Sequence, residues 1–140
     1  GGEDPYDMNV ARMDAHGGWI GTAVDLVRFA VHVDGRGGKP ALLTPGSVMS
    51  MTTPTALKSD YASGWAVNAA PNRWHVGALP GTLSILVTTA DGMSWAALCN
   101  SRAKGGDDAD AMATELDDML WRIVNGVGAG WPDYDLFAVK

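Results

Sequence analysis

Two apolar runs joined by Asp91-Gly92 constrain the fold of this chain more than any other feature of its sequence. The runs TLSILVTTA (82–90) and MSWAALCN (93–100) both have the length and residue types of β-strands. Asp-Gly between two such runs is a strong hairpin signal, because both central residues of a type I′ turn need positive φ. The sequence therefore predicts two adjacent antiparallel strands joined by a type I′ turn.

Two earlier segments, SGWAV at 63–67 and the residues 73–78, also have strand-like composition. Alternate positions of the 82–90 run place apolar side chains on both of its faces: Leu83, Ile85 and Val87 on one, and Ser84, Leu86 and Thr88 on the other. Neither face is fully polar. We therefore expect an antiparallel sheet of about three to four strands that is covered on both sides.

Two helices are predicted before the strands. Apolar residues repeat at helical spacing after Thr22, whose spacing to Asp25 is that of a capping box, and Gly35 ends the repeat. Thr44 followed by Pro45 is an N-cap with proline at the first helical position, which predicts a short helix through about residue 51.

A third helix is predicted from Asp107 or Asp108 to about Asn125, with Gly126 ending it. Its broad apolar stripe is the clearest helical pattern in the chain. The expected organisation is an irregular lead-in over residues 1–18, a partial α+β domain over 19–126 and an extended tail over 127–140.

Charge and hydropathy exclude two classes of partner. Ten basic and sixteen acidic residues give a formal net charge of −6, and no basic cluster suggests binding to nucleic acid. The apolar runs are shorter than the ~18 residues that suggest a membrane span, and residues 1–20 lack the pattern of a signal peptide.

Patterns for metals and cofactors are missing as well. The histidines at 16, 32 and 75 share no ligand spacing, and Cys99 is the single cysteine, expected to act as a buried small hydrophobe. No glycine-rich phosphate loop opens a helix. We therefore expect neither a metal nor a cofactor.

The tetrad Ser101 to Lys104 matches the Ser-x-x-Lys pattern, in which lysine can take the proton of a nucleophilic serine. That chemistry needs both side chains on one helix face, whereas this serine leaves a strand and two glycines follow the lysine. We interpret the tetrad as a chance match.

The segment WHVGALPGT (74–82) is the candidate site. A glycine within a strand permits close approach of a ligand to the backbone. On this interpretation His75 and Gly77 share one face, and the Ala78 N–H is free to donate to a developing oxyanion. The alternative is a strand histidine without a function and a β-bulge at Gly77.

Five segments in this order resemble the C-terminal part of the serine β-lactamase-like family, which includes class C β-lactamases, D-Ala-D-Ala carboxypeptidases and esterases. They are HGGWIGTAVDLVRFA, LLTPGSVMSMTTP, SGWAV, the WHVGALPGT segment and ALCNSR. The resemblance implies that His75-Val76-Gly77 is the third family motif, flanking the substrate, and that Ala78 supplies one oxyanion N–H. Val76 departs from the hydroxyl residue of Lys-Thr-Gly, which favours the esterase or peptidase-like branch.

The family's nucleophile motif Ser-x-x-Lys and its Tyr-x-Asn motif precede these segments, and this chain has no acceptable copy of either. The spacing of Tyr6-Asp-Met-Asn9 is wrong. We therefore expect the C-terminal portion of a serine hydrolase that is inactive alone, with an N-terminal segment as its missing partner. Because that segment extends the sheet in the family, an exposed strand edge and a homodimer through it are also expected.

The resemblance leaves the compartment open, since family members are often periplasmic or secreted but this chain carries no signal. A different hypothesis is a stand-alone binding module that takes a peptide or acyl-amide beside His75. A third is an α+β domain whose likeness to the family is coincidental.

Overall fold

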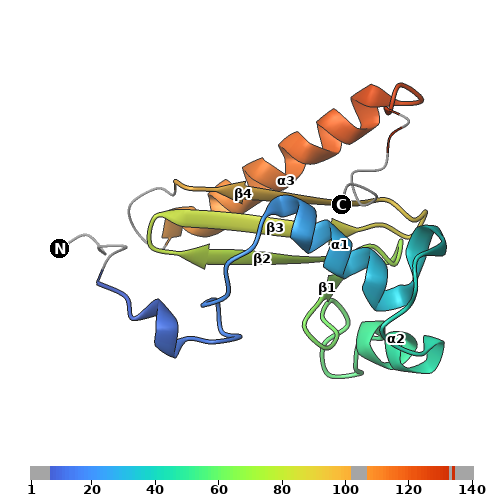
Figure 1. The fold of residues 1–140 in the computed structure, drawn as a ribbon, viewed down its shortest axis with the longest axis horizontal. Coiled ribbons are helices and arrows are strands. Elements are labelled where there is room, and N and C mark those ends of the chain that lie inside the picture. The colour runs from blue at the N-terminus through green and yellow to red at the C-terminus, as the bar shows by residue number, and fades with distance from the viewer. Residues whose placement is uncertain (1–6, 102–106, 133, 135–140) are drawn as a thin grey trace.

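The computed structural model describes residues 7–101, 107–132 and 134. It is an α+β fold with one open antiparallel sheet in the order β1-β2-β3-β4 (Figure 1). The strands are β1 (Ala66–Val67), β2 (Arg73–Leu79), β3 (Thr82–Thr88) and β4 (Ser94–Cys99), and the helices are α1 (Ala23–Asp34), α2 (Pro45–Thr52) and α3 (Asp107–Val127), with short 3-10 turns at Val10–Arg12 and Arg36–Gly38. The predicted class, an antiparallel sheet flanked by helices, is confirmed.

The β2–β3 hairpin positions the candidate site. Its pairing runs without interruption from Arg73 opposite Thr88 to Leu79 opposite Thr82, with a two-residue loop. That loop is Pro80-Gly81, and Gly81 has φ 75°, as the third position of a type II turn requires. Because the register is continuous, the β-bulge considered for Gly77 is absent.

The β3–β4 hairpin forms as predicted, but its turn differs. The Thr89 N–H donates to the Met93 carbonyl at 2.9 Å, and the Gly92 N–H donates to the Thr89 carbonyl at 3.2 Å. Gly92 has φ 100°, whereas Asp91 keeps a negative φ. The prediction of a type I′ turn is therefore wrong, since the loop has three residues and only its glycine is left-handed.

The main core lies between one face of the sheet and α3. Leu83, Ile85 and Val87 of β3 are at most 2% exposed and pack with Ala113 and Leu116 of α3. Full burial of such a side chain contributes roughly 1.5–3 kcal/mol each. The core therefore fixes which face of β3 turns toward α3 and which turns toward α1.

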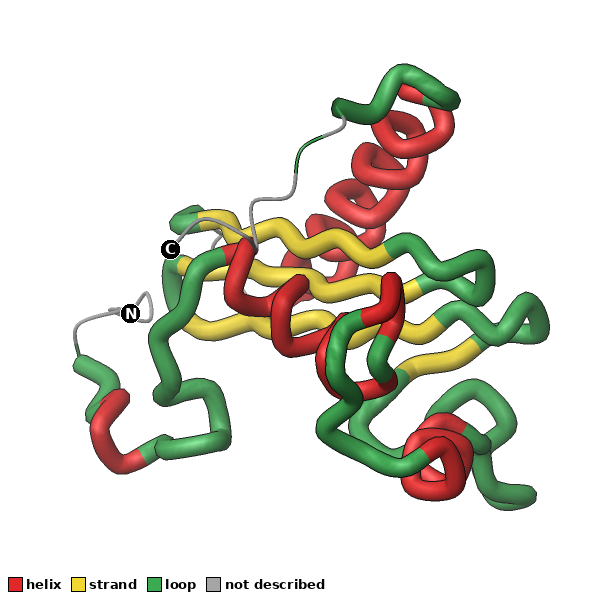
Figure 2. The backbone as a smooth tube through the Cα atoms, turned by 45° about the vertical axis from the view of Figure 1, so that its right-hand side comes forward, coloured by secondary structure: helices red, strands yellow, loops and turns green. Residues whose placement is uncertain are grey.

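Helix α1 covers the opposite face of the sheet, as Figures 1 and 2 show from two directions. It begins with the predicted capping box, in which the Thr22 hydroxyl accepts from the Asp25 N–H at 3.1 Å. It ends at Gly35, whose φ of 71° permits the left-handed cap. Helix α2 begins at Pro45 after the Thr44 cap, also as predicted.

Two predicted boundaries are wrong. Of the 63–67 segment only Ala66–Val67 is strand, because Gly64 has φ 79° and turns the chain before it can pair. Helix α3 passes through Gly126 to Val127, and the first left-handed residue is Gly128, with φ 56°. Glycine can continue a helix at a cost of about 1 kcal/mol, so Gly126 alone does not stop it.

The structure describes only part of each end of the chain. Residues 7–18 consist of turns and one short 3-10 turn, and residues 1–6 of the expected lead-in lie outside the described residues. Half of the predicted extended tail, residue 133 and residues 135–140, lies outside the described residues, and Val127 belongs to α3. No helix in the described part of the chain has the length and hydropathy needed to cross a membrane.

Candidate functional site

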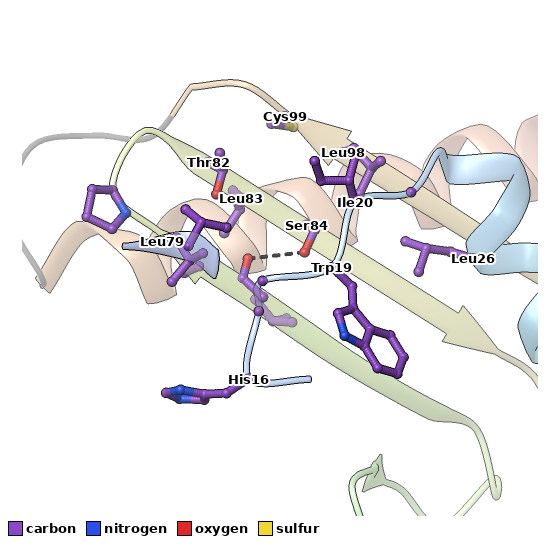
Figure 3. Close-up of a pocket in the computed structure, with 18 of the residues that line it drawn as sticks. His16, Trp19, Ile20, Leu26, Leu79, Thr82, Leu83, Ser84, Leu98 and Cys99 are labelled. Carbon is purple, nitrogen blue, oxygen red and sulfur yellow. Dashed lines mark hydrogen bonds between the residues drawn. The ribbon is translucent and has the colours of Figure 1, made fainter. Parts of the chain in front are cut away.

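A groove of about 920 Å³ lies between the β2–β3 hairpin and the loop that precedes α1 (Figure 3). Its lining is mainly apolar, with side chains from the loop, α1, the hairpin and the end of β4: Trp19, Ile20, Leu26, Leu79, Leu83 and Leu98. A smaller polar set lines it as well: His16, His75, Thr82, Ser84 and Asn100. Such a mixture suits an organic ligand that is oriented by a few polar contacts.

The three predicted site residues, His75, Gly77 and Ala78, all line this groove. The continuous register places Gly77 directly opposite Ser84 of β3. The Ser84 hydroxyl donates to the Gly77 carbonyl at 3.3 Å (Figure 3). A Cβ added at Gly77 would lie 2.5 Å from that hydroxyl oxygen, so glycine is required by packing as well as by access.

The edge of β2 along the groove is open. In the described residues β1 pairs only with Arg73 and Trp74, so the stretch from His75 to Leu79 has no strand on the side away from β3. The backbone of Leu79 turns toward Thr82 to close the hairpin, and successive residues of an antiparallel strand alternate in direction. The Ala78 N–H therefore points toward the open edge, as oxyanion binding requires.

Both ring nitrogens of His75 have partners. Nδ1 lies 2.8 Å from the Val76 carbonyl oxygen, and Nε2 lies 2.9 Å from the hydroxyl oxygen of Tyr61. A carbonyl only accepts, so Nδ1 carries the proton and the Tyr61 hydroxyl donates to Nε2 of the neutral ring. With Nε2 occupied, this histidine is not a free base toward a bound ligand.

Tyr61 is the site residue that the sequence analysis missed. It pairs with Ala66 as an isolated bridge, and this brings it beside β2. Its ring meets the His75 ring edge-on, with centroids 6.0 Å apart and planes at 70°, and the Lys58 ammonium lies 5.2 Å from its centroid. In the sequence, its position shortly before the Ser63-Gly64-Trp65 segment is the one feature that could have pointed to Tyr61.

An activated nucleophile is not assembled among the described residues. Ser84, the serine in the groove, makes its one recorded hydrogen bond to a carbonyl, which cannot activate it. Ser101 is exposed and follows β4, while Lys104 lies outside the described residues. Within the described ranges no group of three His, Cys, Asp or Glu side chains could hold a metal ion.

Cys99 is half-buried and packs against the core between the sheet and α3. The expected burial is therefore only partial, although Cys99 does contribute apolar surface at the end of β4.

Searches of protein-family models, curated proteins and solved structures find no match to this chain. The groove, the open edge of β2 and the motifs in the sequence are therefore the features that bear on function.

Proposed function

We propose that this chain is the C-terminal portion of a serine hydrolase that acts on amide or ester bonds and resembles β-lactamases, D-Ala-D-Ala carboxypeptidases and esterases. One observation carries the proposal. Two segments of the resemblance, residues 16–30 and 74–82, contribute opposite walls of a single groove, where the Ala78 N–H faces an open edge. A random likeness in sequence gives no reason for these segments to meet at a groove.

In the proposed reaction, a serine from an upstream segment attacks the carbonyl carbon of an ester or amide. The C–O π bond opens to an oxyanion, to which the Ala78 N–H donates, and a base of the upstream segment accepts the serine proton. Collapse expels the alcohol or amine, which takes up that proton. Water then hydrolyses the acyl-enzyme and regenerates serine.

The groove lining bears on the substrate class. Trp19, Ile20 and Leu79 make it mainly apolar. Val76 lacks the hydroxyl of the Lys-Thr-Gly form of this motif, and its side chain packs against the core between the sheet and α3. We therefore propose esters or peptide-like amides with an apolar acyl group as substrates.

The reading frame upstream of Gly1 provides the first test. We expect it to encode Ser-x-x-Lys and then Tyr-x-Asn, and the extended chain to hydrolyse p-nitrophenyl butyrate. The 140-residue chain is the matched control and should show only background hydrolysis. An upstream frame without either motif, or activity of the short chain equal to that of the extended chain, would contradict the proposal.

A stand-alone binding module is the second candidate, and the hydrogen bonds of His75 favour it. Both ring nitrogens are already engaged, so the His75 ring is positioned without a catalytic partner. In this case N-acetyl-D-alanyl-D-alanine or a short acyl-peptide should shift the amide NMR signals of 75–79 in the 140-residue chain. The absence of shifts at millimolar ligand would remove this candidate.

A further inference from the structure

We infer that Tyr61 is a positioning residue for His75, holding its imidazole as the Nδ1–H tautomer along the open edge of β2 and away from Gly77 and Ala78. The role of this positioning rests on the proposed function, because the substrate carbonyl is proposed to bind at the open edge of β2. The tautomer and the position of the His75 ring do not depend on any activity.

The tautomer follows from the two partners. The Val76 carbonyl, 2.8 Å from Nδ1, accepts only, so the single proton of the neutral ring lies on Nδ1. The lone pair of Nε2 then needs a donor, and the Tyr61 hydroxyl at 2.9 Å is that donor. Removing this hydroxyl leaves the Nδ1–H form with one hydrogen bond in place of two.

The strand geometry explains why the ring needs to be held. His75 and Gly77 lie on the same face of β2, two residues apart. His75 is exposed, and glycine has no side chain to stop the imidazole from turning over it. Tyr61 supplies the stop from outside the strand, through its hydrogen bond and an edge-on ring contact with centroids 6.0 Å apart.

Tyr61 is itself fixed in place. Its backbone bridges to Ala66, and the Ala62 N–H donates to the Trp65 carbonyl at 2.8 Å, which closes the turn between them. The Lys58 ammonium lies 5.2 Å from the centre of the Tyr61 ring, within the range of a cation–π contact. These contacts hold Tyr61 in place, so that its hydroxyl stays within hydrogen-bond distance of His75.

Long-range ¹H–¹⁵N NMR of the 140-residue chain, at an alkaline pH where imidazole is neutral, reads each tautomer directly. We expect His75 as the Nδ1–H form. His32, whose Nδ1 lies 3.0 Å from the Pro40 carbonyl, is an internal control for a ring that is oriented by a carbonyl.

In Tyr61→Phe we expect the Nε2–H fraction of His75 to rise several-fold, while His32 is unchanged. New nuclear Overhauser contacts should join the His75 ring protons to the Gly77 α protons. Tyr134→Phe, which removes a hydroxyl from an exposed tyrosine, should change neither signal. Retained dispersion of the β-sheet amides shows that the variants fold.

Wild-type His75 in the Nε2–H form would overturn the inference, as would an unchanged tautomer in Tyr61→Phe. Should that variant not fold, Lys58→Ala serves in its place, with a smaller shift in the same direction expected and no shift contradicting the inference. These NMR measurements use the 140-residue chain and do not need the upstream segment. A wrong tautomer prediction is therefore distinguishable from a failure of the extended chain to hydrolyse its substrate.

Discussion

At the residue scale, Gly77 has two separate reasons to be glycine. Its φ lies outside the left-handed region, so backbone strain is not one of them. One reason is packing, because a Cβ would meet the Ser84 hydroxyl at 2.5 Å, and the other is access of a ligand to the β2 backbone. Gly77→Ala disturbs the packing and blocks access at the same time. Gly77→Ala/Ser84→Ala restores the packing but leaves access blocked, so it separates the two reasons.

Gly77→Ala is expected to lower the free energy of unfolding by about 1 kcal/mol, since the Ser84 hydroxyl must move and lose its bond to the Gly77 carbonyl. Urea denaturation measures this change. In Gly77→Ala/Ser84→Ala the stability should return, because the Ser84 Cβ is at ordinary contact distance, 3.9 Å. Hydrolysis by the extended chain should stay low in both variants. Activity that returns with stability would refute the access role.

Asp34 forms the centre of a largely buried ion cluster at the C-terminal end of α1. Its carboxylate accepts from the Arg36 Nε and the Arg73 Nη2, each at 2.7 Å, and its side chain is 10% exposed. Burial raises the pKa of the Asp34 carboxyl, but hydrogen bonds from Arg36 and Arg73 and their charges outweigh it. The net pKa lies below the ordinary aspartate value.

A lowered pKa in the folded state links Asp34 to acid stability. The contribution is present above the unfolded aspartate pKa of about 4 and is lost as pH falls through the lower folded value. Asp34→Asn should destabilise the chain at neutral pH by about 3 kcal/mol, because the buried Arg73 guanidinium loses its carboxylate partner. It should also flatten the loss of stability below pH ~4. Urea midpoints between neutral and acidic pH provide the test, and parallel curves for both proteins would contradict it.

The sequence identifies the residues of the site that are adjacent in the chain and misses the one that is not. His75, Gly77 and Ala78 lie within one strand pattern, so their arrangement follows from period-two alternation. Tyr61 is 14 residues from His75, and Asp34 is 39 residues from Arg73. Both contacts depend on how elements pack, which local patterns do not encode.

At the element scale, β4 leaves the second edge of the sheet open. Among the described residues β4 pairs only with β3, and Leu98 is 46% exposed. Unpaired backbone at such an edge invites another strand. In the proposed whole protein, upstream strands cover it. In the isolated chain, a second copy is expected to do so.

The 140-residue chain should therefore dimerise at high micromolar concentration, as measured by light scattering. Leu98→Lys should shift the equilibrium to monomer, because a lysine on an edge strand opposes pairing. Met119→Lys is the matched control, since Met119 is 43% exposed on α3, and it should leave the dimer intact. A monomer at all concentrations would argue against an edge that requires a partner.

Element types follow from the sequence more reliably than turn geometry does. The caps at Thr22 and Thr44 are local side-chain to backbone bonds, and both form as predicted. The Asp91-Gly92 loop differs because its geometry depends on which residues of the flanking strands pair. Thr89 pairs with Met93, so one more residue enters the loop.

At the scale of the whole molecule, large apolar side chains in the groove and on α1 are exposed. Ile20 is 99% exposed, Trp19 is 77% exposed, and Phe29 on α1 is 55% exposed. Exposed apolar side chains that gather in a patch mark an interaction site, and Trp19 and Ile20 are neighbours in the groove lining. The upstream segment of the proposed hydrolase would cover part of it and place its serine near Ala78.

The most direct test of this account is the intact mass of the extended chain after brief exposure to an acylating substrate such as benzylpenicillin or p-nitrophenyl butyrate. We predict one added acyl group, located on the serine of an upstream Ser-x-x-Lys, and no adduct on the 140-residue chain. An adduct on Ser84 or Ser101, or an extended chain that stays unmodified by both reagents, would contradict the claim that this groove is half of a serine hydrolase site.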